Sequence, residues 1–251
     1  MATEEFHANR QRFNDVEVVS AYGELAGLMP DEEFLIEKYM PEDARVLDLG
    51  VGTGRTAAAL AQRAAVYIGL DYAEQMIATA RERHPELDLR VGDATDLRDF
   101  ADGAFDMVVF SYNGLDYLHP DEARAQSLQE IRRVLAPAGV LLLARHNPRA
   151  VLARPSASAA WPRLLATTAY SSMRRARRLL VTRAFWHGEG YVHEPFRGGL
   201  LHHMATPKRV QAELSRYGFR HELTLGCRAR RRTHVIWTPW YSYAFVTQPP
   251  A

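Results

Sequence analysis

The chain has 251 residues, of which 47% are hydrophobic and 24% are charged, and its formal net charge is +1. This composition excludes a disordered or collagen-like protein, and the length suits a single α/β domain with an insertion. The longest apolar runs, such as GVLLLA, are far shorter than the roughly 18 residues that cross a membrane, and the polar start MATEEFHANR is unlike a secretory signal. One cysteine, Cys227, permits no internal disulfide and fits a reducing compartment. We therefore expect a soluble, cytoplasmic protein.

Charge is distributed unevenly along the chain. Residues 1–130 hold 26 acidic and 11 basic residues, whereas residues 131–251 hold 4 acidic and 20 basic residues. Between Ile131 and Gly188 there is no Asp or Glu. Two interpretations remain open: the halves neutralise each other within one fold, or a basic surface meets an anionic partner.

Two helices are predicted before the first strand, because apolar side chains recur at helical spacing over residues 16–40, interrupted at Pro30. Short apolar strands then alternate with helices. The predicted strands are RVLDL (45–49), VYIGL (66–70), LDLRV (87–91), FDMVVFS (105–111) and GVLLLAR (139–145), and the helices are TAAALAQRAA (56–65), AEQMIATARERH (73–84) and DEARAQSLQEIRRVL (121–135). Continuous apolar strands joined by helices indicate right-handed crossovers and a parallel sheet covered on both faces.

The alternation stops after His146. Residues 147–205 show no clear strand pattern before about Tyr191. The sequence Thr-Pro-Lys at 206–208 then predicts the start of a helix that Gly218 ends, and FRHELTLG and WYSYAFVTQ predict a final pair of strands.

We therefore expect a doubly wound α/β fold in one domain. Its expected parts are N-terminal helices (1–44), a ligand-binding core (45–146), a variable insertion (147–205) and a C-terminal helix with two strands (206–251).

The stretch VLDLGVGTGR (46–55) is an apolar strand that gives way to glycine at every second position. In an open parallel sheet, ligands bind at the carboxyl ends of the strands, where the first strand-to-helix turn comes closest to them. Gly50, Gly52 and Gly54 lack the Cβ atoms that would block this approach, and the following helix presents free N–H groups. A nucleotide-like ligand is expected. Alone, the pattern also fits a nicotinamide dinucleotide, because GTGRTA matches G-x-G-x-x-A and Asp71 ends the second strand.

Two further carboxylates, Asp48 and Asp93, bear on which nucleotide-like ligand is expected. Asp48 lies beside the glycine turn, where it can accept from a cationic or hydroxyl-bearing ligand. Asp93 follows the third strand, where it can accept from the exocyclic amine of a purine. Asp71 would then accept from both hydroxyls of a ribose.

With these residues in place, the chain resembles the class I S-adenosylmethionine-dependent methyltransferases of the small-molecule type. VLDLGVGTGR resembles the glycine motif of that family, IGLDYAEQM its ribose motif, VGDATDL its adenine motif, FDMVVFSYNGLDYL its fourth-strand segment and LQEIRRVLAPAGVLLLARHN its fifth-strand unit. The resemblance implies a Rossmann-like, mostly parallel sheet of seven strands with an antiparallel C-terminal strand pair. It also implies S-adenosyl-L-methionine as cofactor and S-adenosyl-L-homocysteine as product.

The resemblance further implies contacts for individual residues. Asp48 would face the amino group of the cofactor and Asp71 its ribose, while Ser111 and Tyr112 would line the wall beside the sulfonium. Tyr22 either folds over the cofactor or packs as an ordinary helix residue. The implied cofactor-binding residues are Tyr22, Asp48, Gly50, Gly52, Gly54, Asp71, Tyr72, Met76, Asp93, Ala94, Ser111 and Tyr112.

A hydroxyl acceptor would need a base, whereas an unprotonated amine needs little beyond orientation. His146, at the end of the fifth strand, is the first candidate, and Asn113 and Asp116 follow the fourth strand. A structural role for His146, bonded to a loop carbonyl, is the alternative. The insertion contributes His193, His202 and His203, which fit zinc ligation poorly because no cysteine or standard spacing accompanies them, so no metal is predicted.

The insertion also predicts an amphipathic basic helix from Trp161 to residue 183, with Arg174, Arg177 and Arg178 opposite its apolar face. Three interpretations remain open: a lid, a contact with an anionic membrane or lipid-linked substrate, and a clamp for a phosphate-bearing substrate or RNA, with the 228–232 arginine cluster. RNA fits least, because SYNGLDYL lacks the tetrad of amino-methylating nucleic-acid enzymes.

The sequence therefore predicts methyl transfer to a small molecule, with O-methylation favoured over N-methylation and a natural-product or carbohydrate-type acceptor by analogy. A nicotinamide-dependent oxidoreductase is the enzyme alternative. A binding protein that keeps the cofactor fold is the non-catalytic alternative. The oligomeric state is not predicted.

Overall fold

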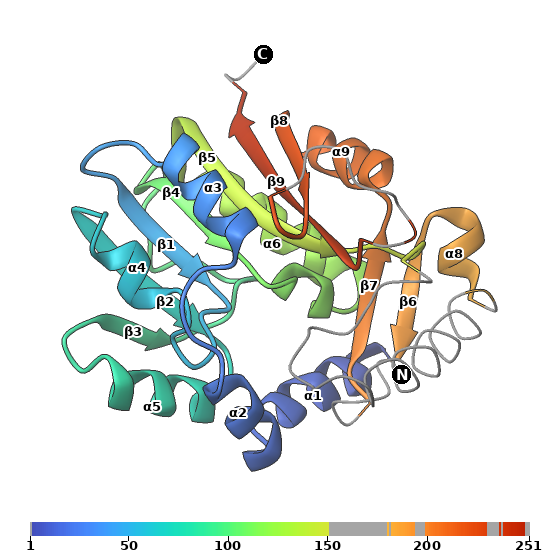
Figure 1. Ribbon diagram of the computed structural model, residues 1–251, viewed down its shortest axis with the longest axis horizontal. Coiled ribbons are helices and arrows are strands. Elements are labelled where there is room, and N and C mark those ends of the chain that lie inside the picture. Colours follow the sequence, from blue (N-terminus) through green and yellow to red (C-terminus); the bar gives the residue numbers. More distant parts are fainter. Residues whose placement is uncertain are drawn as a thin grey trace, which may run out of the picture.

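The computed structural model describes residues 2–150, 180, 182–193, 199–229, 236 and 238–248, with residues 2–7 as backbone only. Its central element is a seven-stranded sheet with the order β3-β2-β1-β4-β5-β9-β8 (Figure 1). The strands of this sheet are β1 (Arg45–Leu49), β2 (Val66–Asp71), β3 (Asp88–Val91), β4 (Phe105–Phe110), β5 (Leu135–His146), β8 (Phe219–Gly226) and β9 (Trp240–Thr247).

Strand pairing follows the predicted class. The neighbours among β1 to β5 are parallel, whereas β9 is antiparallel to both β5 and β8. Strand β1 is buried from Val46 to Leu49, as expected for a central strand covered on both faces. The doubly wound α/β fold with an antiparallel C-terminal strand pair is confirmed.

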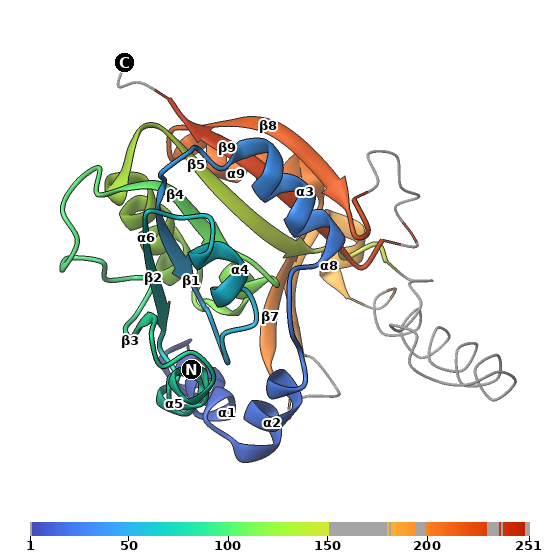
Figure 2. The same ribbon diagram turned by 60° about the vertical axis from the view of Figure 1, so that its left-hand side comes forward.

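Helices cover both faces of the sheet (Figures 1 and 2). Helices α3 (Pro30–Tyr39), α4 (Ala57–Ala61) and α5 (Glu74–Arg83) bury apolar side chains against one face. Helices α6 (Asp121–Val134) and α9 (Pro207–Arg216) pack against the other. The chain therefore has an apolar core on each side of the sheet, and the carboxyl ends of the parallel strands share one edge.

Two boundaries differ from the sequence prediction. The helix predicted over 56–65 ends at Ala61, because the chain must turn before Ala65 and Val66 bond to the carbonyl of Ala44 beside β1. The fifth strand was expected from Gly139 but begins at Leu135, which pairs with Phe105 before an irregularity in the register.

The described part of the insertion contains structure that the sequence did not predict. Strands β6 (Glu189–His193) and β7 (Leu201–Ala205) form a separate antiparallel pair, preceded by α8 (Arg183–His187). The predicted basic helix lies almost entirely outside the described residues, as does most of the arginine cluster at 228–232.

An additional helix, α1 (Ala2–Phe13), precedes the two predicted ones, of which the first is α2 (Val16–Gly23). Asn9 fixes α1 in place: its side-chain amide donates to the carbonyls of Leu201 and Tyr117 at 2.7 and 3.1 Å and accepts from the Leu201 N–H at 3.0 Å. This buried amide ties α1 to β7 and to the short helix η1 (Gly114–Tyr117).

Candidate active site

A pocket lies at the carboxyl ends of β1, β2 and β4, where the sequence predicts the ligand. It is lined by Gly50, Gly52, Asp71 and Ser111, among others. Helices α1 and α2 contribute Phe13 and Tyr22 to its wall, so the N-terminal segment closes one side.

The three glycines of the turn have different surroundings. All have positive φ, at 64°, 56° and 82° for Gly50, Gly52 and Gly54. A Cβ on Gly52 would meet nothing within 4 Å, which means that this position faces open pocket space. A Cβ on Gly54 would come within 2.8 Å of the His84 ring. Gly52 thus allows a ligand to approach, whereas Gly54 allows the turn to pack against α5.

Asp71 connects the glycine turn to the pocket. Its carboxylate accepts hydrogen bonds from the backbone N–H groups of Gly52 and Ala73, with a nitrogen–oxygen distance of 2.9 Å in each. Burial raises the pKa of Asp71 to about 6, although these two hydrogen bonds oppose the shift. Remaining lone pairs on a buried carboxylate in the pocket wall can accept from a vicinal diol.

Asp48 lies beneath the turn rather than in the pocket wall. It is fully buried, and its Oδ2 accepts from Thr56 at 2.6 Å and from Tyr67 at 3.0 Å. Burial raises the pKa of Asp48 to about 6 against those two hydrogen bonds. Its Oδ1 has no hydrogen-bond partner among the described residues. When ionised, this buried carboxylate would favour a cationic ligand in the pocket above the turn through space, without touching it.

Aromatic rings form much of the pocket wall. Phe13 meets the rings of Tyr22, Tyr72 and Tyr117 edge-on at 5.2 to 6.0 Å, and Tyr22 meets Tyr112 at 5.9 Å. Electron-rich ring faces suit a positively charged ligand such as a sulfonium, and the same wall excludes water from it.

The end of β4 has an unusual backbone. Tyr112 and Asn113 both have positive φ, at 50° and 66°. Non-glycine residues rarely adopt this conformation, and clusters of it occur at ligand sites. Asn113 is buried, and its Oδ1 has no partner among the described residues. Ser111 and Tyr112 line the pocket, whereas Asn113 lies behind them.

Arg55 adds a cation that the sequence prediction did not include. Its guanidinium forms a buried ion pair with Glu32 at 2.6 Å, donates to the Ser111 hydroxyl at 3.4 Å and lies 5.1 Å from the centre of the Tyr112 ring. It lines the pocket directly after the glycine turn. The sequence shows that Arg55 ends the glycine motif GTGR, but it does not predict the pairing of Arg55 with Glu32 on α3.

The residues predicted to contact the adenine fall into two groups: those in the pocket wall and one outside it. Tyr72, Met76 and Ala94 line the pocket. Asp93 is not part of the wall; its Oδ1 accepts from the backbone and hydroxyl of Thr95 at 2.9 and 2.7 Å. These bonds shape the loop that presents Ala94.

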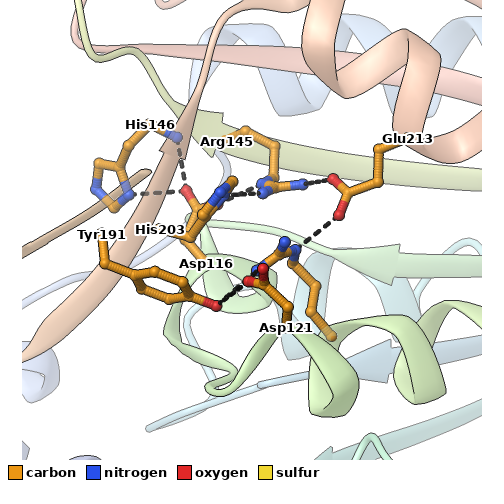
Figure 3. Close-up of polar contacts among 8 residues, drawn as sticks. Asp116, Asp121, Arg145, His146, Tyr191, His203 and Glu213 are labelled. Carbon is orange, nitrogen blue, oxygen red and sulfur yellow. Dashed lines mark hydrogen bonds and ion pairs between the residues drawn. The ribbon is translucent and has the colours of Figure 1, made fainter. Parts of the chain in front are cut away.

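A second polar cluster lies at the ends of β5 and η1 (Figure 3). Asp116 is fully buried and accepts from the backbone N–H of His146 at 2.7 Å, from its ring Nδ1 at 2.9 Å, and from Arg145. Burial opposes ionisation of Asp116, but Arg145 and His146 hold its pKa below the ordinary range. Because this ionised carboxylate can only accept, Nδ1 of His146 carries a hydrogen, and Nε2 is an acceptor whenever the ring is unprotonated.

His146 lies next to the pocket wall. Its ring packs edge-on against Tyr117, which lines the pocket, at 6.0 Å, and lies tilted against His202 at 4.6 Å. Its side chain is 16% exposed. The three residues predicted to be catalytic, Asn113, Asp116 and His146, therefore lie just outside the wall, and their roles stay predictions.

The buried cluster continues away from the pocket. Arg145 also pairs with Glu213 of α9 at 3.0 Å and donates to Nδ1 of His203 at 2.8 Å. Burial and the neighbouring Arg145 and Arg124 lower the pKa of His203 to about 3, so this ring is neutral. Arg124 bonds Glu213 and Tyr191. These contacts connect β5, α6, α9 and the β6–β7 pair around the Asp116–His146 bond.

Among the described residues, no three His, Cys, Asp or Glu side chains come together as a metal site. His193 lies on the exposed end of β6, whereas His202 and His203 are buried near Arg145 and His146. Within the same residues, no helix has the length and apolar character needed to cross a membrane.

Comparison with known proteins supports the class that the fold and pocket define. A family model described as a methyltransferase domain matches residues 46–139. A Bacillus subtilis protein named as a methyltransferase, YqeM, is 33% identical over 136 residues, or 51% of this chain and 53% of the relative. A demethylmenaquinone methyltransferase of Beutenbergia cavernae is 42% identical over 103 residues, or 41% of each chain.

Among solved structures, an S-adenosylmethionine-dependent methyltransferase of Methanosarcina mazei aligns with a TM-score of 0.62 at 20% identity, covering 86% of this chain and 98% of that chain. The likeness shows the shared fold. Residues 46–139 thus carry a methyltransferase domain, and the fold around them is that of the class I S-adenosylmethionine-dependent methyltransferases. Its aligned region spans about half or less of the curated relatives it matches. S-adenosylmethionine is the methyl donor of this family, and the open Gly52 position, the Asp71 carboxylate and the aromatic wall fit that molecule.

Proposed function

We propose that the protein transfers the methyl group of S-adenosylmethionine to a hydroxyl of a small-molecule acceptor, with His146 as the base. The observation that carries the choice of a hydroxyl is the Asp116–His146 bond, which holds the ring with Nε2 as its acceptor beside the pocket-lining Tyr117. An amine acceptor would not require a base held in this way.

Some residues around the pocket would bind the methyl donor, and others would exclude water from it. Asp71 would bind the ribose of the donor, Asp48 would favour its charged end from below, and the Phe13 and Tyr22 rings would exclude water. When bound, the donor supplies a methyl group on a sulfonium, which becomes a neutral thioether once the acceptor oxygen bonds to the methyl carbon and the carbon–sulfur bond breaks. His146 Nε2 would receive the acceptor's proton, and Asp116 would stabilise the resulting imidazolium.

The test is an acceptor screen that measures formation of S-adenosylhomocysteine with phenols, other hydroxylated metabolites, hydroquinones, amines and carboxylic acids. With an active hydroxyl acceptor, His146→Gln should lower kcat by about 100- to 10,000-fold, the usual contribution of a general base. Binding of S-adenosylhomocysteine should be unchanged. His193→Gln, at an exposed histidine of β6, is the control and should keep full turnover.

Transfer to amines alone, or full turnover of His146→Gln with a hydroxyl acceptor, would contradict the proposal. The same panel should include acceptors carrying a lipid chain or a phosphate, since a lipid-linked or anionic acceptor is the second class that the basic half of the sequence allows. No transfer to any acceptor despite tight donor binding would favour a non-catalytic binding protein.

A further inference from the structure

An exposed apolar patch lies on and beside α8. Trp186 is 69% exposed and Leu180 is 42% exposed. The indole N–H of Trp186 donates to the carbonyl of Leu180 at 2.8 Å, and its ring packs edge-on against Phe185 at 5.0 Å. The polar end of the indole is thus bonded within the chain, while its apolar surface faces outward. An exposed tryptophan fixed in this way is typical of an interaction surface rather than of a solvated helix.

Basic side chains lie on α8 and in a groove beside it. Arg183 is exposed on α8 itself. An adjoining groove between α8 and the start of α9 is lined by Arg149, His187, Lys208 and Arg209, and its lining contains no Asp or Glu. Beside this groove, Glu189 pairs with Arg209 at 3.4 Å.

The sequence on both sides of α8 is also basic. No Asp or Glu occurs between Ile131 and Gly188, and residues 131–251 hold 20 basic and 4 acidic residues. Both ribbon views place α8 at the end of the molecule opposite β3, next to the β6–β7 pair (Figures 1 and 2). Strand β3, which belongs to the acidic first half of the chain, would therefore lie away from a negatively charged partner that meets α8.

We propose that this surface, which we call the α8 patch (Arg149, Leu180, Arg183, Trp186, Lys208 and Arg209), docks on the surface of an anionic lipid bilayer. Tryptophan and leucine side chains enter the boundary between headgroups and acyl chains, and arginine and lysine pair with lipid phosphates. A nucleic acid would attract the same arginines and could stack on Trp186, but it would leave the exposed Leu180 unexplained. The proposal is independent of the methyl acceptor.

The experiment is sedimentation of the full chain with vesicles of phosphatidylcholine alone or of phosphatidylcholine and phosphatidylglycerol in equal amounts. The protein should pellet with the anionic vesicles only, and less as salt is added. Arg183→Glu and Lys208→Glu should each weaken partitioning by about fivefold or more, the equivalent of one basic residue at such a surface. Trp186→Ala should weaken it as well, even at high salt, because its contribution is apolar.

Matched controls are Arg63→Glu and Val16→Ala, which change exposed residues away from the α8 patch. They should partition like the unchanged protein. Unaltered melting temperatures and S-adenosylhomocysteine binding of every variant show that the fold is intact. Failure to pellet with anionic vesicles, equal pelleting with neutral ones, equal losses in the controls, or binding to RNA in place of vesicles would overturn the proposal.

Discussion

Asp71 is the residue whose contacts bear most directly on donor binding. Its carboxylate accepts hydrogen bonds from the backbone N–H groups of Gly52 and Ala73, and the residue lines the pocket. Asp71→Ala should weaken binding of S-adenosylhomocysteine by about 1–3 kcal/mol, the range for hydrogen bonds to a charged group. Calorimetric titration measures the loss, and circular dichroism checks that the fold persists. Unchanged affinity would remove Asp71 from the site.

The same residue predicts a pH dependence. Burial raises the pKa of Asp71 to about 6, and a protonated carboxyl loses acceptor capacity for the ribose. Affinity for S-adenosylhomocysteine should therefore fall as the pH is lowered through about 6, and Asp71→Asn should flatten this dependence. Because the pKa of Asp48 is also raised to about 6, Asp48→Asn is the comparison that separates the two groups.

We expect ionised Asp48 to lower the stability of the fold while it favours binding of the donor. Its folded-state pKa of about 6 exceeds the ordinary 3.8, so the folded state retains its proton to higher pH and stability falls as the pH rises between these values. At pH 8, Asp48→Asn should raise the free energy of unfolding by about 1–3 kcal/mol and weaken donor binding. Near pH 3 to 4 the gain should vanish. Urea denaturation at both pH values measures it, and a loss of stability at pH 8 would refute this explanation.

At the residue scale, the sequence predicted the side chains that belong to the glycine, ribose and adenine motifs. Gly52, Asp71 and Met76 line the pocket because their positions depend on local turns at strand ends. Phe13 and Tyr117 also line it but could not be predicted. They reach the pocket only because Asn9 joins α1, β7 and η1 across more than a hundred residues of sequence.

Among the elements, the glycine turn offers a matched pair of substitutions. Both Gly52→Ala and Gly54→Ala place a side chain at positive φ, which costs about 1–2 kcal/mol of strain. Only the Gly54 Cβ meets a neighbour, the His84 ring at 2.8 Å. Gly54→Ala should therefore be the less stable variant, whereas Gly52→Ala should lose about tenfold or more in donor affinity because its methyl group occupies ligand space.

Denaturation and titration of the two glycine variants give both quantities. Equal donor affinity for Gly52→Ala and the unchanged protein would show that the open space at Gly52 is not where the donor binds. Loss of stability at Gly52 that matches the loss at Gly54 would mean that strain alone governs the turn.

Element prediction succeeded where apolar periodicity was strong. Buried strands such as β1 and β4 and the helices between them follow directly from it. Strands β6 and β7 form a short pair outside the main sheet, and the burial of β6 does not alternate along the strand, so its sequence EGYVH shows no alternation to detect. Helix α1 has a mostly polar sequence, and its described anchors are the buried amide of Asn9 and the Phe13 ring, which packs against Tyr22, Tyr72 and Tyr117.

In the whole molecule, the acidic and basic halves meet inside the fold. Arg145 from the basic half is fully buried against Asp116 from the acidic half, and it also bonds Glu213 and His203. The charge imbalance of the sequence thus produces internal pairs as well as the basic surface around α8. Composition alone could not show which arginines would be buried.

This buried cluster predicts a large effect on global stability. Arg145→Met leaves Asp116 without its main cationic partner and should lower the free energy of unfolding by about 3–5 kcal/mol. Arg90→Met, at a half-exposed pair with Asp88, should cost less than about 1 kcal/mol. Urea denaturation of both variants compares them. Similar small losses would show that the cluster contributes nothing beyond a surface ion pair.

Calorimetric titration of the protein with S-adenosylhomocysteine, with NADH as the comparison ligand, tests the central claim most directly. The structure predicts micromolar binding of S-adenosylhomocysteine, no binding of NADH, and a clear loss of affinity in Gly52→Ala. Binding of NADH alone, or an affinity for S-adenosylhomocysteine that Gly52→Ala and Asp71→Ala leave unchanged, would contradict the assignment of this pocket to the methyl donor.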